Sequence, residues 1–406
     1  MAVFANRTSG SQSSLREANL ARIVEEITRF GGLTQVEIAS AAGLSTATIS
    51  NLVRELSDRG LVETRKVVRN GRRAFLVTLV RQTGIGIGMH IGQRSLRIVV
   101  GDFTHKVLLA KHLPLPEMHK PDTTMQRGVE LIYEMLDSLG TDISEVVGLT
   151  AAVSAPIGLE TSQIAVPGIL PGWDDVDIKG KLSESLNLEV HVENDANMAA
   201  LAEFRDGAAS GIENFVYVWA DYEIGGAIVS RGELVRGVTG LAGELGHFQV
   251  DPLGMICKCG NRGCLDTVVG APRLVSLLSI THGDMTFQDL VDNAAGGDPG
   301  CMRVISEAAV RIGQAAANLC ISTDPEVLVV GGLLTNTGDV FLTPFRETLH
   351  RLIFPNALDP IDVIPGTLGK DAPAIGAMIR SLDAAVPAPT AGSSQRSDAG
   401  RGDGGA

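Results

Sequence analysis

The chain has 406 residues, 44% of them hydrophobic, which is enough for two or three domains with buried cores. It has no apolar run long enough to cross a membrane and no leader-like start, so we expect a cytoplasmic protein with no membrane partner. Five cysteines, an odd number, argue against a disulfide framework.

Charge divides the chain unevenly. Residues 1–82 carry twelve Lys and Arg against seven Asp and Glu, a net of +5, whereas the remainder carries a net of −18. A basic head on an acidic body indicates that only the head meets a polyanion. Residues 1–14 are expected to be a flexible N-terminus, and the Gly-, Ala-, Ser- and Pro-rich residues 383–406 a disordered tail.

Residues 15–81 predict a small helical domain that ends in a hairpin. The apolar residues between 15 and 30 follow a helical stripe. Thr34, with Glu37 three residues later, is a capping-box pattern that begins a second helix, to about residue 41. Gly43 predicts a tight turn before the next helix, and two helices joined in this way form a helix-turn-helix.

A third helix follows Ser45, which can cap it. Its buried face is expected to hold Ile49, Leu52, Val53 and Leu56. The opposite face carries small or polar side chains that can approach a major groove closely. The DNA contacts predicted on this helix are Ser45, Thr46, Ala47, Ser50, Asn51 and Arg54.

A basic hairpin comes next. Two β-prone runs flank Asn70-Gly71, a strong signal for a two-residue turn. Arg69, Arg72 and Arg73 lie at its tip, where guanidinium groups could reach phosphates or the minor groove. The alternative is a helical packing module with solvated charges. The order of the elements favours a winged helix-turn-helix that binds double-stranded DNA.

From residue 82 the pattern becomes that of α/β domains, with short Gly- and Val-rich strands alternating with helices. IGIGMHIG, LRIVVGDF, VVGLTAAVSAP and EVLVVGGLL are predicted strands, and GVELIYEMLDSLG and residues 307–321 predicted helices. The run GIGIG suggests a dinucleotide fingerprint, but no helical pattern follows it, so we discount that interpretation.

Two polar segments stand out in this body. VENDANMAALAEF, residues 192–204, predicts a strand that ends in Glu-Asn-Asp and then an Ala-rich helix, and polar groups at a strand's C-terminal end can hydrogen-bond a ligand's hydroxyls. GLAGELGHFQV places Glu244 and His247 three residues apart among glycines.

The segment CKCGNRGCLD, residues 257–266, packs three cysteines into eight positions. Core packing fits poorly because Lys258, Asn261 and Arg262 interleave with them, and the expected compartment disfavours a disulfide. Soft ligands at this spacing favour tetrahedral Zn²⁺. The predicted ligands are Cys257, Cys259, Cys264 and, ten residues upstream, His247.

GELGH followed by CKCGNRGCLD, with VENDAN upstream, closely resembles the ROK family (repressors, open reading frames and kinases), and the winged helix resembles its sugar-responsive repressors of the xylose-repressor type. The resemblance covers about residues 15–382. It implies a winged helix-turn-helix plus a two-lobed α/β actin-like body that assembles as a homodimer or tetramer. The first lobe would span 82–200, completed by about 370–382, and the second, with the zinc site, 201–369.

The resemblance also implies residue roles. It assigns structural zinc to His247 and the three cysteines, and a sugar or sugar-phosphate effector to Asn194, Asp195, Glu244, His247 and Asp266. In the family's kinases the residue at Asp195 is the general base. PGILPGWDD, residues 167–175, resembles the sugar-proximal loop; the alternative is a surface loop with Trp173 packed.

Three departures from the family pattern bear on function. His90-Ile91-Gly92-Gln93-Arg94 replaces the kinases' Asp-x-Gly-Gly-Thr phosphate loop, and Asp221-Tyr222-Glu223 falls within the second, glycine-rich loop. Such loops bind phosphate through bare backbone N–H groups, so carboxylates there oppose phosphoryl transfer. Asp266 stands where the family usually has Glu.

We therefore predict a sugar-responsive transcriptional regulator, a repressor of carbohydrate uptake or catabolism genes, with no catalytic residues and with Asp195 as a vestigial base. One alternative is a bifunctional sugar kinase with a DNA-binding head, which the retained Asp195 favours. Another is a DNA-binding protein whose body responds to a protein partner.

Overall fold

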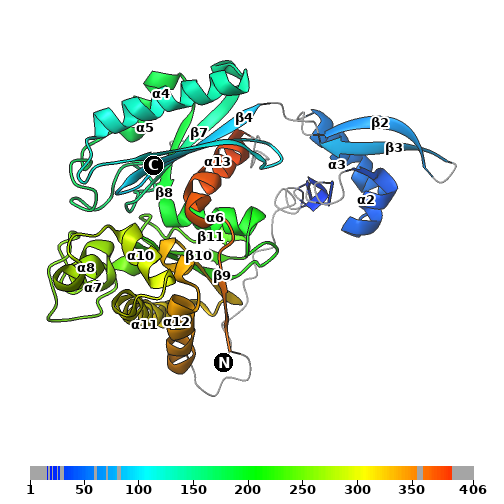
Figure 1. Ribbon diagram of the computed structural model, residues 1–406. Coiled ribbons are helices and arrows are strands. Elements are labelled where there is room, and N and C mark those ends of the chain that lie inside the picture. Colours follow the sequence, from blue (N-terminus) through cyan, green and yellow to red (C-terminus); the bar gives the residue numbers. More distant parts are fainter. Residues whose placement is uncertain are drawn as a thin grey trace, which may run out of the picture. The chain divides into compact units, whose positions relative to one another are not determined.

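The computed structural model describes residues 32–58, 62–69, 72–79, 84–353 and 360–385, together with 16, 19–20, 22–24 and 26–27 (Figure 1). Two compact units divide near residue 82, one of them the N-terminal head and the other the body over Thr83–Ala385. No helix within the described ranges is both long and apolar enough to cross a membrane.

The head is a winged helix-turn-helix. The described residues between 16 and 27 are helical, and helices α2 (Gln35–Ala42) and α3 (Thr46–Asp58) follow. The capping box on α2 is confirmed, because the Glu37 backbone N–H donates to Thr34 Oγ1 at 3.3 Å and the Thr34 N–H to Glu37 Oε2 at 2.8 Å. Gly43 ends α2 in the left-handed region, with φ of 64°. The helix-turn-helix predicted from this stretch is therefore present.

Helix α3 packs as its sequence predicts. The Thr48 backbone N–H donates to Ser45 Oγ at 3.1 Å, which confirms Ser45 as the cap. All four residues of the predicted apolar face are buried, and they join a core that also holds residues from the first helical segment and from the hairpin strands. That core fixes the orientation of the exposed face of α3.

The wing is an antiparallel hairpin of β2 (Val62–Arg69) and β3 (Arg72–Leu79), with Arg69 paired to Arg72 as a two-residue connection requires. Residues 70–71 and the side chains of the three tip arginines lie outside the described part of the chain. A short strand, β1 (Leu33–Thr34), pairs with β3 and completes the sheet.

The first sheet of the body has the order β6-β5-β4-β7-β8. Its strands are β4 (Ile85–Ile91), β5 (Ser95–Asp102), β6 (Val107–Pro114), β7 (Val146–Val153) and β8 (Val190–Asn194). The first three are antiparallel, while β7 and β8 run parallel to β4. Helices α4 (Pro121–Leu139) and α5 (Ile178–Leu186) lie over one face (Figure 1).

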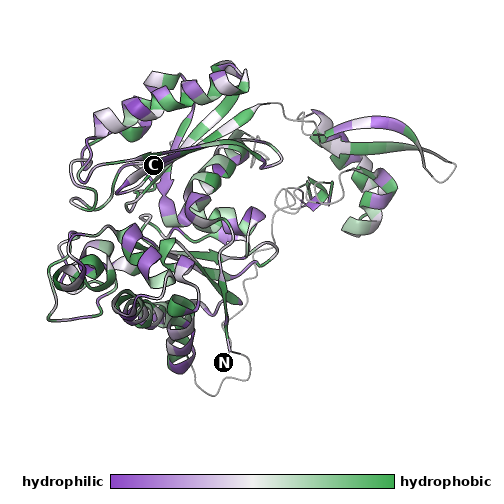
Figure 2. Cartoon of the chain, viewed as in Figure 1, coloured by the Kyte–Doolittle hydropathy of each residue, from purple (hydrophilic) through white to green (hydrophobic). Residues whose placement is uncertain are grey.

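The second sheet has the order β11-β10-β9-β12-β13. Its strands are β9 (Phe215–Ala220), β10 (Ile224–Ser230), β11 (Glu233–Leu234), β12 (Val327–Gly331) and β13 (Asp362–Pro365). One face packs on α10 (Phe287–Ala295), α11 (Pro299–Thr323) and α12 (Asp339–Leu352). The central strands of the two sheets, such as β4, β7 and β9, are strongly hydrophobic (Figure 2), as buried strands require.

Helices α6 (Asp195–Asp206) and α13 (Ala372–Ala385) connect the two sheets. Alanines of α6 pack on β9 and β10 of the second sheet, while α13 packs on β4, β5 and β7 of the first and also against α6. The body is therefore sheet, helices, sheet, the two-lobed α/β arrangement that the resemblance implies. Because Asp195 is the first residue of α6, this packing also sets the position of a predicted ligand contact.

The GIGIG run has a packing role. Gly86 and Gly88 lie on β4 directly under α13, and a Cβ on Gly88 would overlap the Ala374 carbonyl oxygen and the Met378 backbone nitrogen. Glycine is required because a helix backbone lies where a side chain would project. Discounting a dinucleotide fingerprint here agrees with this structure.

Candidate functional site

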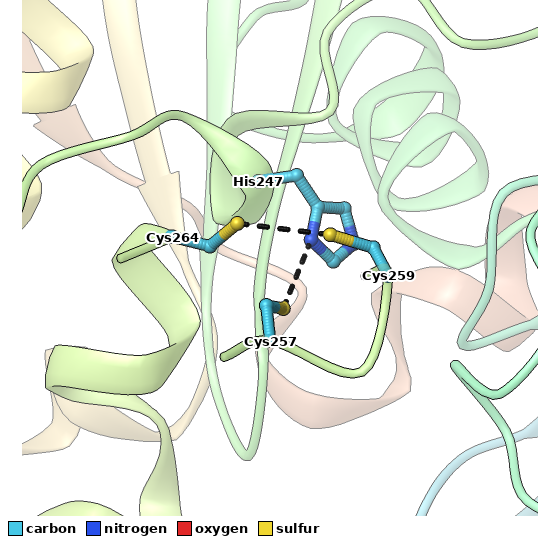
Figure 3. A group of neighbouring side chains, drawn as sticks. All are labelled: His247, Cys257, Cys259 and Cys264. Carbon is cyan, nitrogen blue, oxygen red and sulfur yellow. Dashed lines mark hydrogen bonds between the residues drawn. The ribbon is translucent and has the colours of Figure 1, made fainter. Parts of the chain in front are cut away.

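Four potential metal ligands converge on one point in the second lobe (Figure 3). The ligand atoms of His247, Cys257, Cys259 and Cys264 all lie within 4.8 Å of one another. Cys257 Sγ is 3.7 Å from His247 Nδ1, and Cys259 Sγ is 3.7 Å from Cys264 Sγ. A tetrahedral zinc with Zn–S bonds of about 2.3 Å separates its sulfurs by about 3.8 Å, so the sulfur spacing fits a metal ion.

The backbone around the cysteines explains how ligands at such short spacing can meet. His247 ends the 3₁₀ helix η2 (Leu245–His247), and Cys264 caps the short helix α7 (Leu265–Val269). Gly260 and Gly263 between them have φ of 87° and 69°, which only glycine adopts readily. A Cβ on Gly263 would also collide with the Asp251 carbonyl group, so the tight return of the loop depends on that glycine.

Protonation at this cluster is coupled to metal binding. Burial raises the pKa of the Cys257 and Cys264 thiols, and burial followed by the charge of Lys258 lowers the pKa of His247. A neutral imidazole suits a metal ligand, whereas the thiols must lose their protons. The four side chains can therefore hold one metal ion, and its binding should release protons.

A second His-Asp-Cys group in the same lobe has a structural explanation. His282 Nε2 lies 3.1 Å from Asp298 Oδ1 and 4.0 Å from Cys301 Sγ. The same Asp298 oxygen accepts the Cys301 backbone N–H at 2.8 Å and so caps α11. We interpret this group as a helix cap with an ion pair.

Asn194 and Asp195 lie where β8 ends and α6 begins, both buried. Asn194 Oδ1 accepts the Asn197 N–H at 3.0 Å and its Nδ2 donates to the Ala155 carbonyl at 3.2 Å, so Asn194 caps α6. Asp195 Oδ1 accepts the Ala196 N–H at 2.8 Å. The N-terminus of α6 therefore holds the Asp195 carboxylate in a fixed orientation.

Two residues from other segments also hold Asp195, and the sequence predicted neither of these contacts. Ser154 Oγ donates to Asp195 Oδ2, and His90 Nε2 lies 3.4 Å from the same oxygen. By the family resemblance, His90 is predicted to stand where the kinases carry the aspartate of their first phosphate loop. Nδ1 of His90 is buried and has no hydrogen-bond partner among the described residues.

Three acidic side chains, Glu223, Glu244 and Asp266, lie near Asp195, and we call these four residues the carboxylate cluster. Burial, and then the charges of the other three, raise the pKa of Glu244 to about 8. Burial, followed by the charge of Glu223, raises the pKa of Asp266 to about 7, although Asp266 Oδ1 accepts the Ile224 N–H at 2.8 Å. The structure thus brings together acidic residues that are up to 71 positions apart in the chain.

Glu223 joins three segments of the body. Its Oε2 accepts from Gln93 Nε2 of the first lobe at 2.9 Å, and its Oε1 is 2.9 Å from Lys258 Nζ of the metal-binding loop. Gln93 and Glu223 stand in the β4–β5 and β9–β10 turns, which the family resemblance predicts to match the kinases' two phosphate loops. These turns therefore contact each other through side chains. The sequence had singled out Glu223 as a carboxylate within the second loop, but it did not predict that Glu223 contacts Gln93 and Lys258.

Asp221 in the same turn has a structural role. The buried carboxylate accepts the N–H groups of Tyr222 at 2.8 Å and Leu333 at 2.9 Å, which ties the end of β9 to the segment after β12. Burial raises the pKa of Asp221, and the two N–H donors oppose that rise. A backbone N–H that could bind a phosphate is thereby already occupied.

A pocket of about 380 Å³ opens beside the carboxylate cluster. It is bounded by Ile169 from the first lobe and by second-lobe residues that include His247 and Asp266. Ile169 belongs to the 167–175 loop, whose Trp173 is fully buried and donates from Nε1 to the His119 carbonyl at 3.2 Å. The packing of Trp173 is confirmed. The sugar-proximal role of the loop stays a prediction, which the position of Ile169 at the pocket supports.

The predicted DNA contacts are accessible. Ser45, Thr46, Ala47, Asn51 and Arg54 are exposed and Ser50 is half-buried. They lie opposite the buried face of α3, which is the placement that a recognition helix needs.

A winged helix-turn-helix joined to a two-lobed body with a polar pocket defines a class of protein, the DNA-binding regulators with a kinase-like ligand-binding body. Comparison with known proteins then places the chain within a family. The ROK family model matches residues 86–383, and the chain belongs to that family. The MarR family model matches residues 21–73, in agreement with a MarR-like winged helix-turn-helix.

Individual relatives include regulators and a kinase. The chain is 25% identical over 367 residues to a xylose repressor of Bacillus spizizenii, covering 90% of this chain and 95% of that one. It is 34% identical over 249 residues to a glucokinase of Halalkalibacterium halodurans, covering 57% and 75%. A crystal structure of a ROK family transcriptional regulator, a homologue of the E. coli MLC protein, has the same fold with a TM-score of 0.75 over 92% and 98% of the two chains, at 22% identity. The chain is thus a transcriptional regulator of the ROK type.

Proposed function

We propose that this protein represses carbohydrate uptake or catabolism genes as a homodimer or tetramer, and that a sugar bound between its lobes controls its affinity for a near-palindromic operator. One observation carries the proposal. A DNA-binding head occurs in the same chain as a body whose pocket is lined by Glu223, His247 and Asp266. Glu244 and Asp195 lie near these acidic residues. Its similarity to a xylose repressor supports a sugar as the effector.

The polar groups at the pocket suit a sugar's hydroxyls. Carboxylates accept hydroxyl protons in charge-assisted hydrogen bonds. His247 Nδ1 lies beside Cys257, which leaves Nε2 as the ring nitrogen that can face a ligand. We propose that Asn194, Asp195, Glu244, His247 and Asp266 contact the sugar.

We further propose that the bound metal is zinc and that its role is structural. When bound, zinc would supply four bonds that fix the loop from His247 to Cys264, including the orientation of the His247 ring. The same loop carries Lys258, which holds Glu223. A fixed loop would thus present both His247 and the Glu223 contact to the pocket.

Phosphoryl transfer is disfavoured in our proposal. Asp195, the base position, is already engaged through Oδ2 by Ser154 and His90, and Glu223 brings a negative charge to the second phosphate loop. A kinase needs both loops to neutralise and position the transferred phosphoryl group. The bifunctional kinase remains the second candidate because of the similarity to a glucokinase.

The experiment that tests the function is thermal melting of the purified protein against a panel of sugars and sugar phosphates, each with and without Mg-ATP. A ligand at about a hundred times its dissociation constant adds about 2.7 kcal/mol to the state that it binds, which a melting shift reports. A shift with one sugar and none from ATP is the expected result. A further shift from ATP, with sugar-dependent ADP release that Asp195→Asn abolishes, would establish the kinase instead. If no sugar or sugar phosphate of the panel shifts the melting temperature, the result would favour a body that responds to a protein partner.

The route from sugar to DNA is proposed to be lobe closure, which changes the spacing of the two heads in the dimer and therefore their fit to successive major grooves. Distances between spin labels on the two heads of a dimer should change when the sugar is added. Equal spacing with and without bound sugar would contradict this route.

A further inference from the structure

We propose that the effector is a neutral, unphosphorylated sugar and that the pocket discriminates against sugar phosphates. The inference rests on the proposed sugar-sensing function and narrows its ligand class. Two features of the body carry it, namely the acidic groups around the pocket and the pairing of the cations near the former phosphate loops.

The acidic groups come first. Two residues of the carboxylate cluster, Glu223 of the β9–β10 turn and Asp266 of α7, line the pocket, and Asp195 is buried at the start of α6. Burial weakens solvent screening of the charge on those carboxyl groups that are ionised, so its field on a ligand is stronger than it would be at the surface. Hydroxyl groups gain from such acceptors, whereas a phosphate dianion is repelled by them.

The cations near the two turns already have acidic partners. Lys258 pairs with Glu223 at 2.9 Å and Arg97 with Asp371 at 3.0 Å. Arg94 lies 3.6 Å from Glu117. A phosphate at the former loops would have to displace a carboxylate from one of these cations, and the carboxylate would then be left without its counter-ion.

The β9–β10 turn is closed to phosphate by its geometry as well as by its charge. Glu223 bridges Gln93 and Lys258, so its carboxylate lies between the first lobe and the metal-binding loop. Asp221 accepts the Tyr222 and Leu333 N–H groups that could otherwise point at an anion. Both the donors and the space that a phosphate requires are therefore taken by side chains of this chain.

One cation bounding the pocket offers a competing route. Arg273 lines the pocket, is exposed, and has no acidic partner among the interactions of the described residues. A sugar phosphate that entered from the mouth could use it. The variant Arg273→Gln separates this route from binding at the former phosphate loops.

The test compares each sugar with its own phosphate by isothermal titration calorimetry of the full, metal-loaded protein. The probes are D-glucose, N-acetyl-D-glucosamine and D-xylose, each paired with its 6-phosphate or 5-phosphate. The sugar that binds should bind at least about a hundredfold more tightly than its phosphate, equivalent to about 2.7 kcal/mol. A phosphate that binds as tightly as its parent sugar, or more tightly, overturns the inference, and loss of that binding in Arg273→Gln would locate it at the pocket mouth.

Two variants test the cause of the discrimination. Glu223→Gln removes one charge and keeps a side chain of the same shape, whose single carbonyl oxygen can accept from Gln93 or from Lys258. It should reduce the ratio of the two dissociation constants by about tenfold. Glu213→Gln, the same change on an exposed side chain away from the turns, should leave that ratio unchanged. An unchanged ratio in Glu223→Gln would overturn the assignment to this turn.

The outcomes separate the two levels of the proposal. Preference for a phosphate leaves sugar sensing intact and refutes only the neutral-ligand inference. Absence of binding by every probe, in protein that contains its metal and melts cooperatively, refutes sugar sensing and this inference with it.

Discussion

Substituting Gly88 by Ala should loosen the contact between the first sheet and the helices that position Asp195. A Cβ at residue 88 would lie 3.0 Å from the Ala374 carbonyl carbon and closer still to two backbone atoms of α13. Carbon atoms in contact are normally about 3.5–4.0 Å apart, so α13 must withdraw by on the order of 1 Å. Because backbone atoms cannot rotate away, we expect the upper end of the range for overpacking, about 3 kcal/mol.

That energy converts to a measurable melting shift. The body has about 300 residues, and an unfolding entropy of about 2.1 cal/mol/K per residue makes 3 kcal/mol equal to about 5 °C. The control is Gly148→Ala on the neighbouring strand β7, where a Cβ would lie 3.4 Å from the Glu189 carbonyl oxygen and 3.7 Å from that of Ser381. Calorimetry should show the control within about 1 °C of wild type.

The same variant should weaken ligand binding, since α13 packs on α6 and a displaced α6 carries Asp195 with it. The melting shift produced by the effector should therefore shrink in Gly88→Ala and persist in Gly148→Ala. A Gly88→Ala protein that melts within about 1 °C of wild type would refute the packing argument.

Three further predictions concern the metal, pH and DNA. Cys264→Ala should lose the bound metal by elemental analysis and a chelator should no longer lower its melting temperature, whereas Cys320→Ala, buried in α11, should keep one metal per chain. Burial lowers the pKa of His119, so folding favours the neutral form of its ring. The free energy of unfolding is therefore highest above about pH 6.5 and falls as the pH drops below that value. Urea unfolding of His119→Gln should depend less on pH than that of wild type. Arg54→Ala should weaken operator binding by about 1–3 kcal/mol without changing the melting temperature. The control Arg127→Ala, on the body, should leave operator binding unchanged.

Local rules predicted much of the head and the metal centre. The capping box at Thr34, the cap at Ser45 and the buried face of α3 depend on residues within a few positions of one another, and all three are confirmed. The cysteine cluster is nearly as local, because glycines with positive φ fold its ligands together within 18 residues. Short-range patterns of this kind can be predicted from the sequence because the interacting residues are close together in it.

Long-range contacts were less accessible. Nothing local connects Ser154 or His90 with Asp195, and Gln93 meets Glu223 only because the two turns face each other across the body. Helix α11 also begins at Pro299, earlier than predicted, because Asp298 caps it and Pro299 fits its first turn. The contacts of Asp195 and Glu223 lie outside the window in which periodicity operates, whereas the start of α11 depends on adjacent residues and was a missed local signal.

The central claim is that a sugar held at Asp195 controls DNA binding by the head. Fluorescence anisotropy with an operator duplex should be measured with and without the sugar that stabilises the protein, for wild type and for Asp195→Asn. We predict that the sugar changes operator affinity of wild type at least tenfold, and that Asp195→Asn binds the operator equally well in both conditions. An operator affinity that the sugar leaves unchanged in wild type, or that responds equally in Asp195→Asn, would contradict the account.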